Sequence, residues 1–203
     1  MEKKEYSYTT VTKSDLETLL QHRVSIIDMQ KIFSAYDMAE SVHEYQFRND
    51  GSPYFYHTTR TTKILIDIAE IYDIDVLCAA LLHDVLEDSP VLTKEVLEYN
   101  FGAYTAYLVE ILTKELSAPK DDIHQIEKEY VQRLSESPID ALLIKLAARL
   151  DNFRCLQFHL KRNPFHYIQS TEQQFFPLAE QSANIAAKKL VHELKIERNK
   201  FIG

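Results

Sequence analysis

The sequence has little glycine, no tryptophan and almost no cysteine. Its 203 residues include three glycines, six prolines and two cysteines. Glycine averages about 7% of ordinary sequences and supplies the positive-φ corners of hairpins and of glycine-rich phosphate loops. Three glycines therefore argue against barrels, sandwiches and glycine-rich nucleotide cradles. The composition leaves an all-α fold as the prediction, and the length is typical of one domain with a sizeable core.

Cysteine and long apolar runs give no sign of secretion or of a membrane span. Cys78 and Cys155 both lie inside apolar helical patterns, which predicts buried, reduced thiols rather than a disulfide framework. No stretch approaches the roughly 18 apolar residues that cross a bilayer, and the first residues carry acids instead of an apolar signal core. We predict a cytoplasmic protein with no membrane contact.

Basic stretches are also scarce. The chain has 31 acidic and 23 basic residues, which gives a formal net charge of −8. Nucleic-acid binders usually present a basic face, so we expect no nucleic-acid partner. A small anionic substrate would need positive charge concentrated in one pocket.

Apolar residues recur at spacings of three and four through most of the chain, and strand-like alternation is hard to find. This periodicity predicts about eight to ten helices in one domain over residues 1–203. The first starts near Ser14, where Ser14 and Glu17 suit a capping box. The others are expected over 25–46, 54–71, 76–87, 93–100, 104–114, 121–136, 138–162 and 165–197.

The segment 76–87 is almost wholly apolar until its end, which is typical of a buried central helix. His83, Asp84, Glu87 and Asp88 cluster at that end, and burying unpaired charge costs several kcal/mol unless a partner or a metal compensates. On one continuous helix the four side chains would share a face. A histidine and an aspartate can bind a divalent cation, while two further acids hold and deprotonate a water. The alternative is a helix that simply ends in polar residues at the surface.

A second histidine, His57, lies in the preceding predicted helix and would face the same central helix if the two helices pair. A lone histidine is more often a hydrogen-bonded core residue than a metal ligand. His57, however, belongs to a longer local pattern, which favours the ligand interpretation.

That pattern is one of several motifs that occur in order. They are Ala35-x3-Ala39-x3-His43-x2-Gln46-x-Arg48-x2-Gly51-x-Pro53-Tyr54-x2-His57, Ala80-Leu-Leu-His83-Asp84-Val-x-Glu87-Asp88, Phe101-Gly102, Val109-x3-Thr113-Lys114, Ile144-Lys-Leu-Ala-x-Arg149-Leu-x-Asn152-x-Arg154 and Thr171-x5-Pro177-Leu178-Ala179. Together they closely resemble the HD-type hydrolase domain of the RelA/SpoT family over roughly residues 30 to 180.

The resemblance implies an all-α, metal-dependent phosphohydrolase that removes the 3′-pyrophosphate of guanosine tetra- or pentaphosphate, usually with Mn²⁺. It implies a small-molecule nucleotide carrying a pyrophosphate as the partner. By position, three of the four metal ligands would be His57, His83 and Asp84. Glu87 and Asp88 match the acids that position the attacking water. Residues matching or suspected near the nucleotide pocket are Arg48, Tyr54, Asn152 and Arg154.

The fourth ligand departs from the family pattern. The family's last motif reads Lys-Leu-Ala-Asp-Arg-Leu-His-Asn, with a metal-binding aspartate, whereas this chain has Ala148 in that place and Asp151 three residues later. Three residues turn a helix by about 300° and advance it by about 4.5 Å, so Asp151 lies on a neighbouring patch. It would reach a metal only through a shifted helix or a bridging water. The alternatives are direct ligation by Asp151, or a pocket-lining or solvated aspartate.

The sequence is compatible with three alternative functions. The leading one is a hydrolase domain standing alone, because 203 residues leave no room for the synthetase and regulatory domains of the large family members. The second is a catalytically weakened or inactive protein that binds a nucleotide or a protein partner, which Ala148 supports. The third is hydrolysis of another phosphate ester, against which the match of Arg48 and Asn152 weighs. Oligomeric state is not indicated.

Overall fold

The computed structural model describes residues 4–114, 123–158 and 163–201. Within these residues the predicted all-α fold is confirmed, with no strand and only an isolated bridge between Phe47 and Pro53. Ten of the described α-helices are eight residues or longer. In chain order the α-helices are α1 Lys4–Ser7, α2 Lys13–Leu20, α3 Ile26–Val42, α4 Phe55–Asp67, α5 Ile74–Leu82, α6 Val85–Asp88, α7 Lys94–Phe101, α8 Ala103–Leu112, α9 Ile123–Ser135, α10 Ile139–Cys155, α11 Pro164–Gln174, α12 Phe176–Gln181 and α13 Ile185–Asn199.

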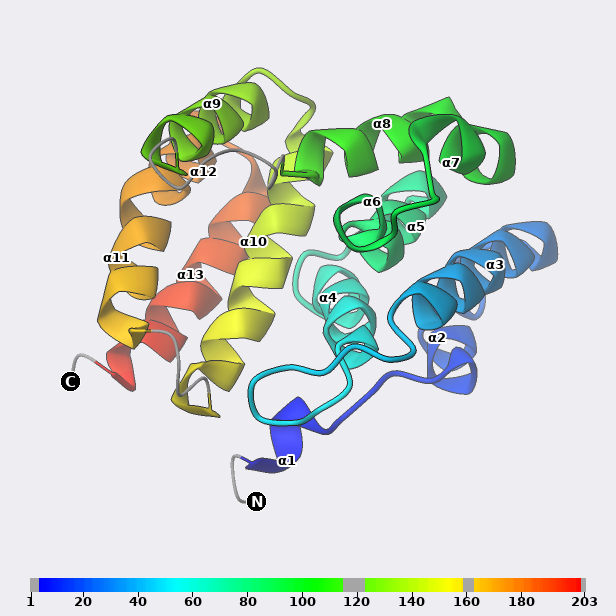
Figure 1. Cartoon of the computed structure of the whole chain (residues 1–203), viewed down its shortest axis with the longest axis horizontal. Coiled ribbons are helices and arrows are strands. Elements are labelled where there is room, and N and C mark those ends of the chain that lie inside the picture. The colour runs from blue at the N-terminus through cyan, green and yellow to red at the C-terminus, as the bar shows by residue number, and fades with distance from the viewer. Residues whose placement is uncertain (1–3, 115–122, 159–162, 202–203) are drawn as a thin grey trace.

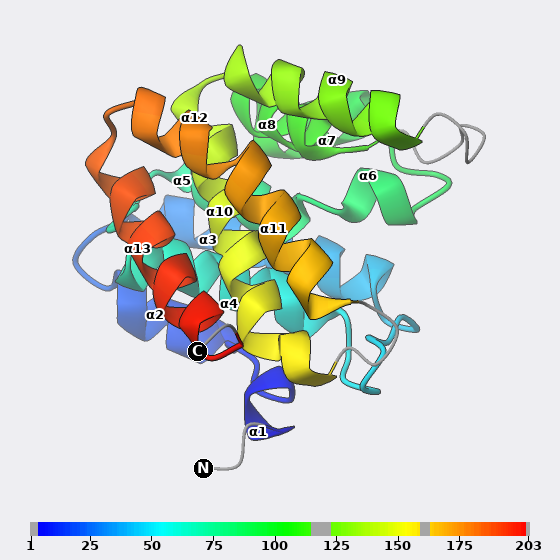
Figure 2. The same cartoon turned by 90° about the vertical axis from the view of Figure 1, so that its left-hand side faces the viewer.

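Helix α10 forms the centre of the fold. It packs along α4 on one side and α13 on the other, and α5 and α8 also contact it. Figure 1 shows α11 and α13 on one side of α10 and the α4–α5 pair on the other, and the perpendicular view of Figure 2 shows α10, α11 and α13 side by side. Twelve of its seventeen residues are buried, as expected for a helix surrounded by neighbours.

Helix α5 is the predicted buried central helix, but it is shorter than predicted. Every residue from Val76 to Leu82 is at most 1% exposed. The helix ends at Leu82, Asp84 has φ −108° and ψ −3°, and the single turn of α6 follows. His83 Nδ1 lies 2.8 Å from the Ala80 carbonyl, the group that accepts from residue 84 in a continuous helix. The expected shared face of one helix is therefore replaced by a junction between two.

Side-chain caps set the starts of the early helices. Thr12 and Asp15 form the capping box of α2, so the N-cap lies two residues before the predicted Ser14. Ser25 and Asp28 form the same motif at α3, which ends at Val42 instead of Gln46. The chain then turns through a loop in which Gly51 adopts φ +85°, and this loop leads into α4.

Two further sequence predictions concern the ends of helices and the cysteines. The predicted helix over 121–136 is described from Ile123, and residues 121 and 122 lie outside the described residues, as does the predicted end at Arg162. Cys78 and Cys155 are free and buried, as predicted. The described part of the chain contains no helix long and apolar enough to cross a membrane. The cytoplasmic location and the single domain over 1–203 stay predictions.

Candidate functional site

A cavity of about 260 Å³ opens where the loop before α4, the junction between α5 and α6, and α10 meet. It contains predicted metal ligands and predicted nucleotide contacts together. Its lining residues are Phe47, Arg48, Asn49, Tyr54, His57, His83, Asp84 and Asn152. The mixture of two imidazoles, a carboxylate and an amide is suited to a polar ligand.

His57, His83 and Asp84 form a compact metal group. Each offers one ligand atom, and these atoms lie within 4.8 Å of one another. The two imidazole rings are 5.3 Å apart between centroids, and His83 Nε2 lies 3.2 Å from Asp84 Oδ2. Both histidines are less than 5% exposed, although they come from different helices. The structure thus brings together the three predicted ligands that fully match the family pattern.

Hydrogen bonds at the far nitrogen fix how each imidazole faces this group. His83 Nδ1 donates to the Ala80 carbonyl at 2.8 Å, since a carbonyl can only accept. His57 Nδ1 donates to Asp151 Oδ2 at 2.6 Å. When a ring is neutral, this bond leaves its lone pair on Nε2. Two imidazole nitrogens and one carboxylate oxygen are a donor set that suits a divalent transition-metal ion, so the residues present fit such an ion.

The charges of the metal group differ from one member to the next. Burial lowers the pKa of His57 to about 4, so this ring is neutral near pH 7. Burial also acts to lower the pKa of His83, but the Asp84 carboxylate outweighs it and raises that pKa. Burial opposes ionisation of Asp84, yet His83 holds the pKa of Asp84 well below its usual range. The Tyr54 hydroxyl donates to Asp84 Oδ2 at 2.6 Å and steadies the carboxylate.

Glu87 and Asp88 lie on α6, within one turn of Asp84, but neither is among the described residues that line the cavity. Glu87 accepts a hydrogen bond from the Lys114 backbone N–H at 2.5 Å. Asp88 Oδ2 lies 3.6 Å from His43 Nδ1. Burial, and next the Asp84 charge, raise the pKa of both acids. A raised pKa brings a carboxylate closer to the range in which it exchanges protons near neutral pH.

Asp151 is separated from the metal group by the His57 ring. It is 0% exposed, and its carboxylate is bonded by Tyr6, Arg48 and Arg60 as well as by His57. We call Asp151, Tyr6, Arg48 and Arg60 the Asp151 cluster. Burial acts to raise the pKa of Asp151, but Arg60 and His57 hold it well below its usual range. Direct ligation and a solvated or pocket-lining side chain were the predicted alternatives; the described contacts make Asp151 a buried ion-pair partner of Arg48 and Arg60.

The predicted nucleotide contacts on α10 separate into two groups. Asn152 lines the cavity, and its amide oxygen accepts from Arg48 while its nitrogen donates to Tyr167 at 3.0 Å. Arg154 lies elsewhere, with Nη2 3.7 Å from Glu193. Two residues turn a helix by about 200°, so side chains at 152 and 154 leave α10 on nearly opposite faces.

Tyr6 was not predicted as a member of the site, and Arg60, which the sequence places near His57, was not predicted as the partner of Asp151. Arg60, three residues after His57, is 3% exposed and binds both Asp151 oxygens, at 2.6 and 3.2 Å. An arginine in a buried helix face signals a buried acid, but the sequence does not say which one. Tyr6 is 145 positions from Asp151, so no spacing rule connects them.

A second group of cations surrounds Tyr130, beyond Glu87. The ammonium groups of Lys114 and Lys145 lie 4.7 and 4.8 Å from the centre of its ring. Arg149, one turn after Lys145 on α10, is buried and stacks 4.4 Å from the centre of the Tyr167 ring. Burial, and next the neighbouring Lys145 and Arg149 charges, lower the pKa of Lys114 to about 8. Repulsion among these cations would be relieved by an anion.

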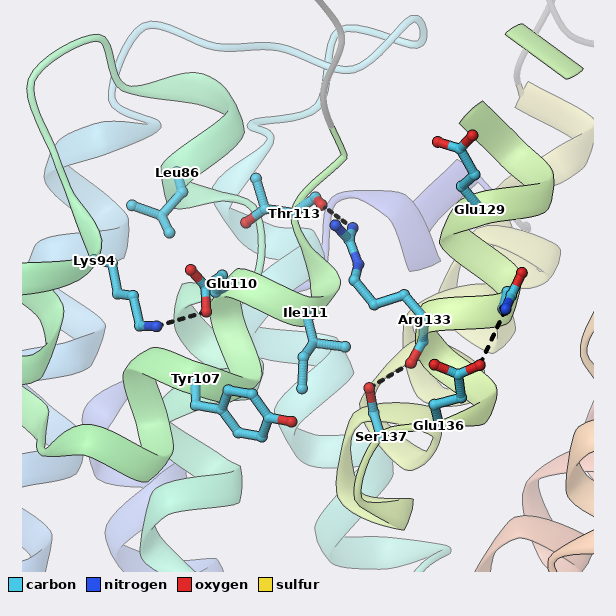
Figure 3. Close-up of a pocket in the computed structure, with 11 residues that line it drawn as sticks. Leu86, Lys94, Tyr107, Glu110, Ile111, Thr113, Glu129, Arg133, Glu136 and Ser137 are labelled. Atoms are coloured by element: carbon cyan, nitrogen blue, oxygen red, sulfur yellow. Dashed lines mark hydrogen bonds and ion pairs between the residues drawn. The ribbon is translucent and has the colours of Figure 1, made fainter. Parts of the chain in front are cut away.

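A larger cavity of about 660 Å³ lies between α7, α8 and α9 (Figure 3) and holds none of the metal group. Its charged groups are already engaged, because Lys94 pairs with Glu110 at 2.7 Å and Arg133 donates to the Thr113 carbonyl at 2.6 Å. Size alone therefore does not identify the functional site. The smaller cavity is the one that contains the three candidate metal ligands.

Comparison with known proteins gives consistent matches. A family model described as "HD domain" matches residues 35–183. The MESH1 protein of Mus musculus, named guanosine-3′,5′-bis(diphosphate) 3′-pyrophosphohydrolase, is 36% identical over 153 residues, which are 74% of this chain and 82% of that protein. A Vibrio cholerae protein with the same enzyme name is 30% identical over 185 residues, 90% of this chain and 25% of that protein.

A solved structure is also similar. It is described as a metazoan ortholog of SpoT that hydrolyzes ppGpp and plays a role in starvation responses. It matches with a TM-score of 0.70 and 31% identity, and the match covers 81% of this chain and 94% of that one. Sequence and fold therefore agree on the same relatives.

Proposed function

The chain belongs to the HD domain family, and from this membership we propose that it is a metal-dependent 3′-pyrophosphohydrolase of guanosine 3′,5′-bis(diphosphate). The observation that carries the proposal is the metal group, in which one ligand atom each from His57, His83 and Asp84 converge at a cavity, while the Nδ1 atoms of both imidazoles are bonded elsewhere. The proposed substrate is inferred from the enzyme name of the relatives. The residues of this chain supply the means to bind and hydrolyse it.

We propose Mn²⁺ as the metal, held by His57 Nε2, His83 Nε2 and Asp84. A bound divalent cation polarises a phosphoryl oxygen and lowers the pKa of a coordinated water. Three protein ligands leave positions for water and for a substrate oxygen. Tyr54, which donates to Asp84, orients the carboxylate toward this site.

Glu87 and Asp88 are proposed to orient the attacking water and to take its proton. Both follow Asp84 within one turn, and the Asp84 charge helps to raise the pKa of each. The water oxygen bonds to the phosphorus next to the ribose 3′ oxygen, and the bond between that oxygen and the phosphorus breaks. The products are pyrophosphate and a nucleotide with a free 3′ hydroxyl.

The phosphates of the substrate require cations, and these are concentrated despite the net charge of −8. Three cationic side chains lie near Glu87, namely Lys114, Lys145 and Arg149. Their mutual repulsion favours the binding of an anion beside them. Arg48 and Asn152 line the cavity but are bonded to each other and, for Arg48, to Asp151. We therefore assign the two a role in shaping the pocket wall. Phe47, 64% exposed at the same cavity, offers a ring on which a base can stack.

The second candidate function is an HD-domain protein that binds a nucleotide or a protein partner without turnover. The observation that favours it is Ala148, which is 5% exposed and offers only a methyl group where the family pattern has a metal-binding aspartate. With Asp151 sealed behind His57, the site keeps a single carboxylate ligand. Lower metal affinity follows.

Purified protein with Mn²⁺ should release pyrophosphate from guanosine tetraphosphate, and His83→Ala should abolish the release. Metal content of the protein as purified, measured by elemental analysis, tests the site before any substrate is added. A control is Lys189→Ala, which changes an exposed lysine paired with Glu70 far along the chain from the metal group. No turnover together with no bound metal would exclude the enzyme and leave the binding function.

A further inference from the structure

Asp151 is a carboxylate with no lone pair left for a metal ion. Oδ2 accepts from His57 Nδ1 at 2.6 Å, from Arg48 at 3.0 Å and from Arg60 Nη2 at 3.2 Å. Oδ1 accepts from Arg60 Nε at 2.6 Å and from the Tyr6 hydroxyl at 3.0 Å. A carboxylate offers about four lone-pair sites, and five donors occupy them. Any effect of Asp151 on the metal must therefore pass through another residue.

His57 is the residue through which it can act. Two arginines keep Asp151 an anion, and an anionic carboxylate only accepts hydrogen bonds. The proton of the His57 ring is therefore held on Nδ1, and the lone pair is held on Nε2, toward the metal group. Metal-binding histidines generally donate their other ring nitrogen to a carboxylate or carbonyl, and that partner fixes the tautomer and the ring orientation.

We propose that Asp151 is a positioning residue for metal binding, which holds His57 in the tautomer and orientation that present Nε2 to the metal group. The inference rests on the proposed metal-dependent function. An aspartate at position 148 would contact the ion directly, whereas the aspartate at position 151 acts on the same ion through an imidazole ring. Arg60 on α4 and Arg48 in the loop before α4 both bind the carboxylate, so the His57 ring is anchored to the core of the fold.

A purely structural role makes different predictions. If Asp151 served only as counter-ion to Arg60 and Arg48, its removal would lower stability without changing the tautomer of His57 or the affinity for metal. The first measurement therefore uses the unaltered, metal-free protein. Two-bond ¹H–¹⁵N NMR correlations of the imidazole rings, with His57→Gln to assign the signal, should place the proton on Nδ1. A proton on Nε2 would overturn the proposal.

The second measurement is Mn²⁺ affinity, by titration calorimetry and by electron paramagnetic resonance of the free ion. Asp151→Asn should weaken Mn²⁺ binding about 10- to 100-fold, the usual effect of losing such a partner. If this variant does not fold, the double variant Asp151→Leu with Arg60→Met removes the Asp151–Arg60 ion pair and leaves Arg48 bonded to Asn152. Replacing a buried ion pair with apolar residues is often tolerated. The double variant should show the same loss of affinity.

Asp140→Asn is the matched control. Asp140 lies on the same helix and accepts a tyrosine hydroxyl, from Tyr104 at 2.6 Å, but it does not contact His57. Its Mn²⁺ affinity should stay within twofold of the unaltered protein. Binding within threefold in the Asp151 variants would overturn the positioning role. Metal binding without turnover of the guanosine nucleotide would instead refute the proposed function and leave this inference standing.

Discussion

Two buried polar clusters meet at His57, and they differ in whether their polar atoms face a cavity or are bonded within the protein. The metal group lies at a cavity between two neighbouring helices, and its three ligand atoms are within 4.8 Å of one another. The Asp151 cluster joins α1, the loop before α4, α4 and α10, and every lone pair of its carboxylate is engaged. The first cluster is open to exchangeable ligands, whereas the second is closed by the protein. Binding and stability should therefore respond to different substitutions around one imidazole ring.

Asp84→Asn should give the largest effect, on the open side. The amide is isosteric and can still accept from Tyr54, but the only anionic ligand of the metal group is lost. Pyrophosphate release should fall to background, while the free energy of unfolding should fall less than on removal of the Asp151 carboxylate, because the amide keeps the Tyr54 hydrogen bond. Steady-state assays with Mn²⁺ and urea unfolding measure the two quantities. Retained turnover would mean that chemistry does not use the metal group.

Asp151→Ala should give the next largest effect, on the closed side and in stability. Removing the carboxylate leaves Arg60 and Arg48 buried with uncompensated charge, which typically costs about 3–5 kcal/mol. Urea unfolding compares this variant with Asp140→Ala, which removes a half-buried aspartate from the same helix. Equal losses in the two variants would show that the Asp151 cluster contributes no special stability.

The open cluster was predictable because its members are local in sequence. His83 and Asp84 are adjacent, and their burial cost is readable from the apolar run before them. His57 was placed by helix pairing and by the family resemblance. Periodicity likewise predicted α5 and α10, since a helix buried on all sides leaves few polar positions. What periodicity missed was the break at His83, where a side chain binds the carbonyl that would continue the helix.

The closed cluster was not predictable, for the converse reason. Its contacts span 91, 103 and 145 positions, and no periodic rule selects Asp151 among 31 acids as the partner of Arg60, Arg48 or Tyr6. Helix geometry placed Asp151 on a neighbouring patch of the helix but did not indicate what would surround it. The same geometry, applied to Arg154, would have placed that side chain away from Asn152.

Ala148→Asp should add a fourth ligand to the open cluster and leave the closed one unchanged. We expect Mn²⁺ affinity to rise by about 10- to 100-fold, because a carboxylate replaces a methyl group in the family's ligand position. Calorimetric titration measures the change, and the His57 tautomer should remain as in the unaltered protein. No change in metal content or in turnover would mean that position 148 does not face the metal.

The pH dependence of substrate binding should give the smallest effect and extend the comparison to the cations beyond Glu87. Lys114 has a pKa lowered to about 8, so it is charged at pH 7 and loses its proton as the pH rises through 8. If its charge holds a phosphate, KM should rise by at most about tenfold between pH 7 and pH 9, because the neutral amine must first regain a proton. Lys114→Met should have a higher KM at pH 7 and no such rise above pH 8.

Parallel pH profiles of KM for the two proteins would mean that the phosphate binds away from Lys114. A profile that flattens in the variant, with kcat unchanged, would separate the group that binds the anion from the group that holds the metal.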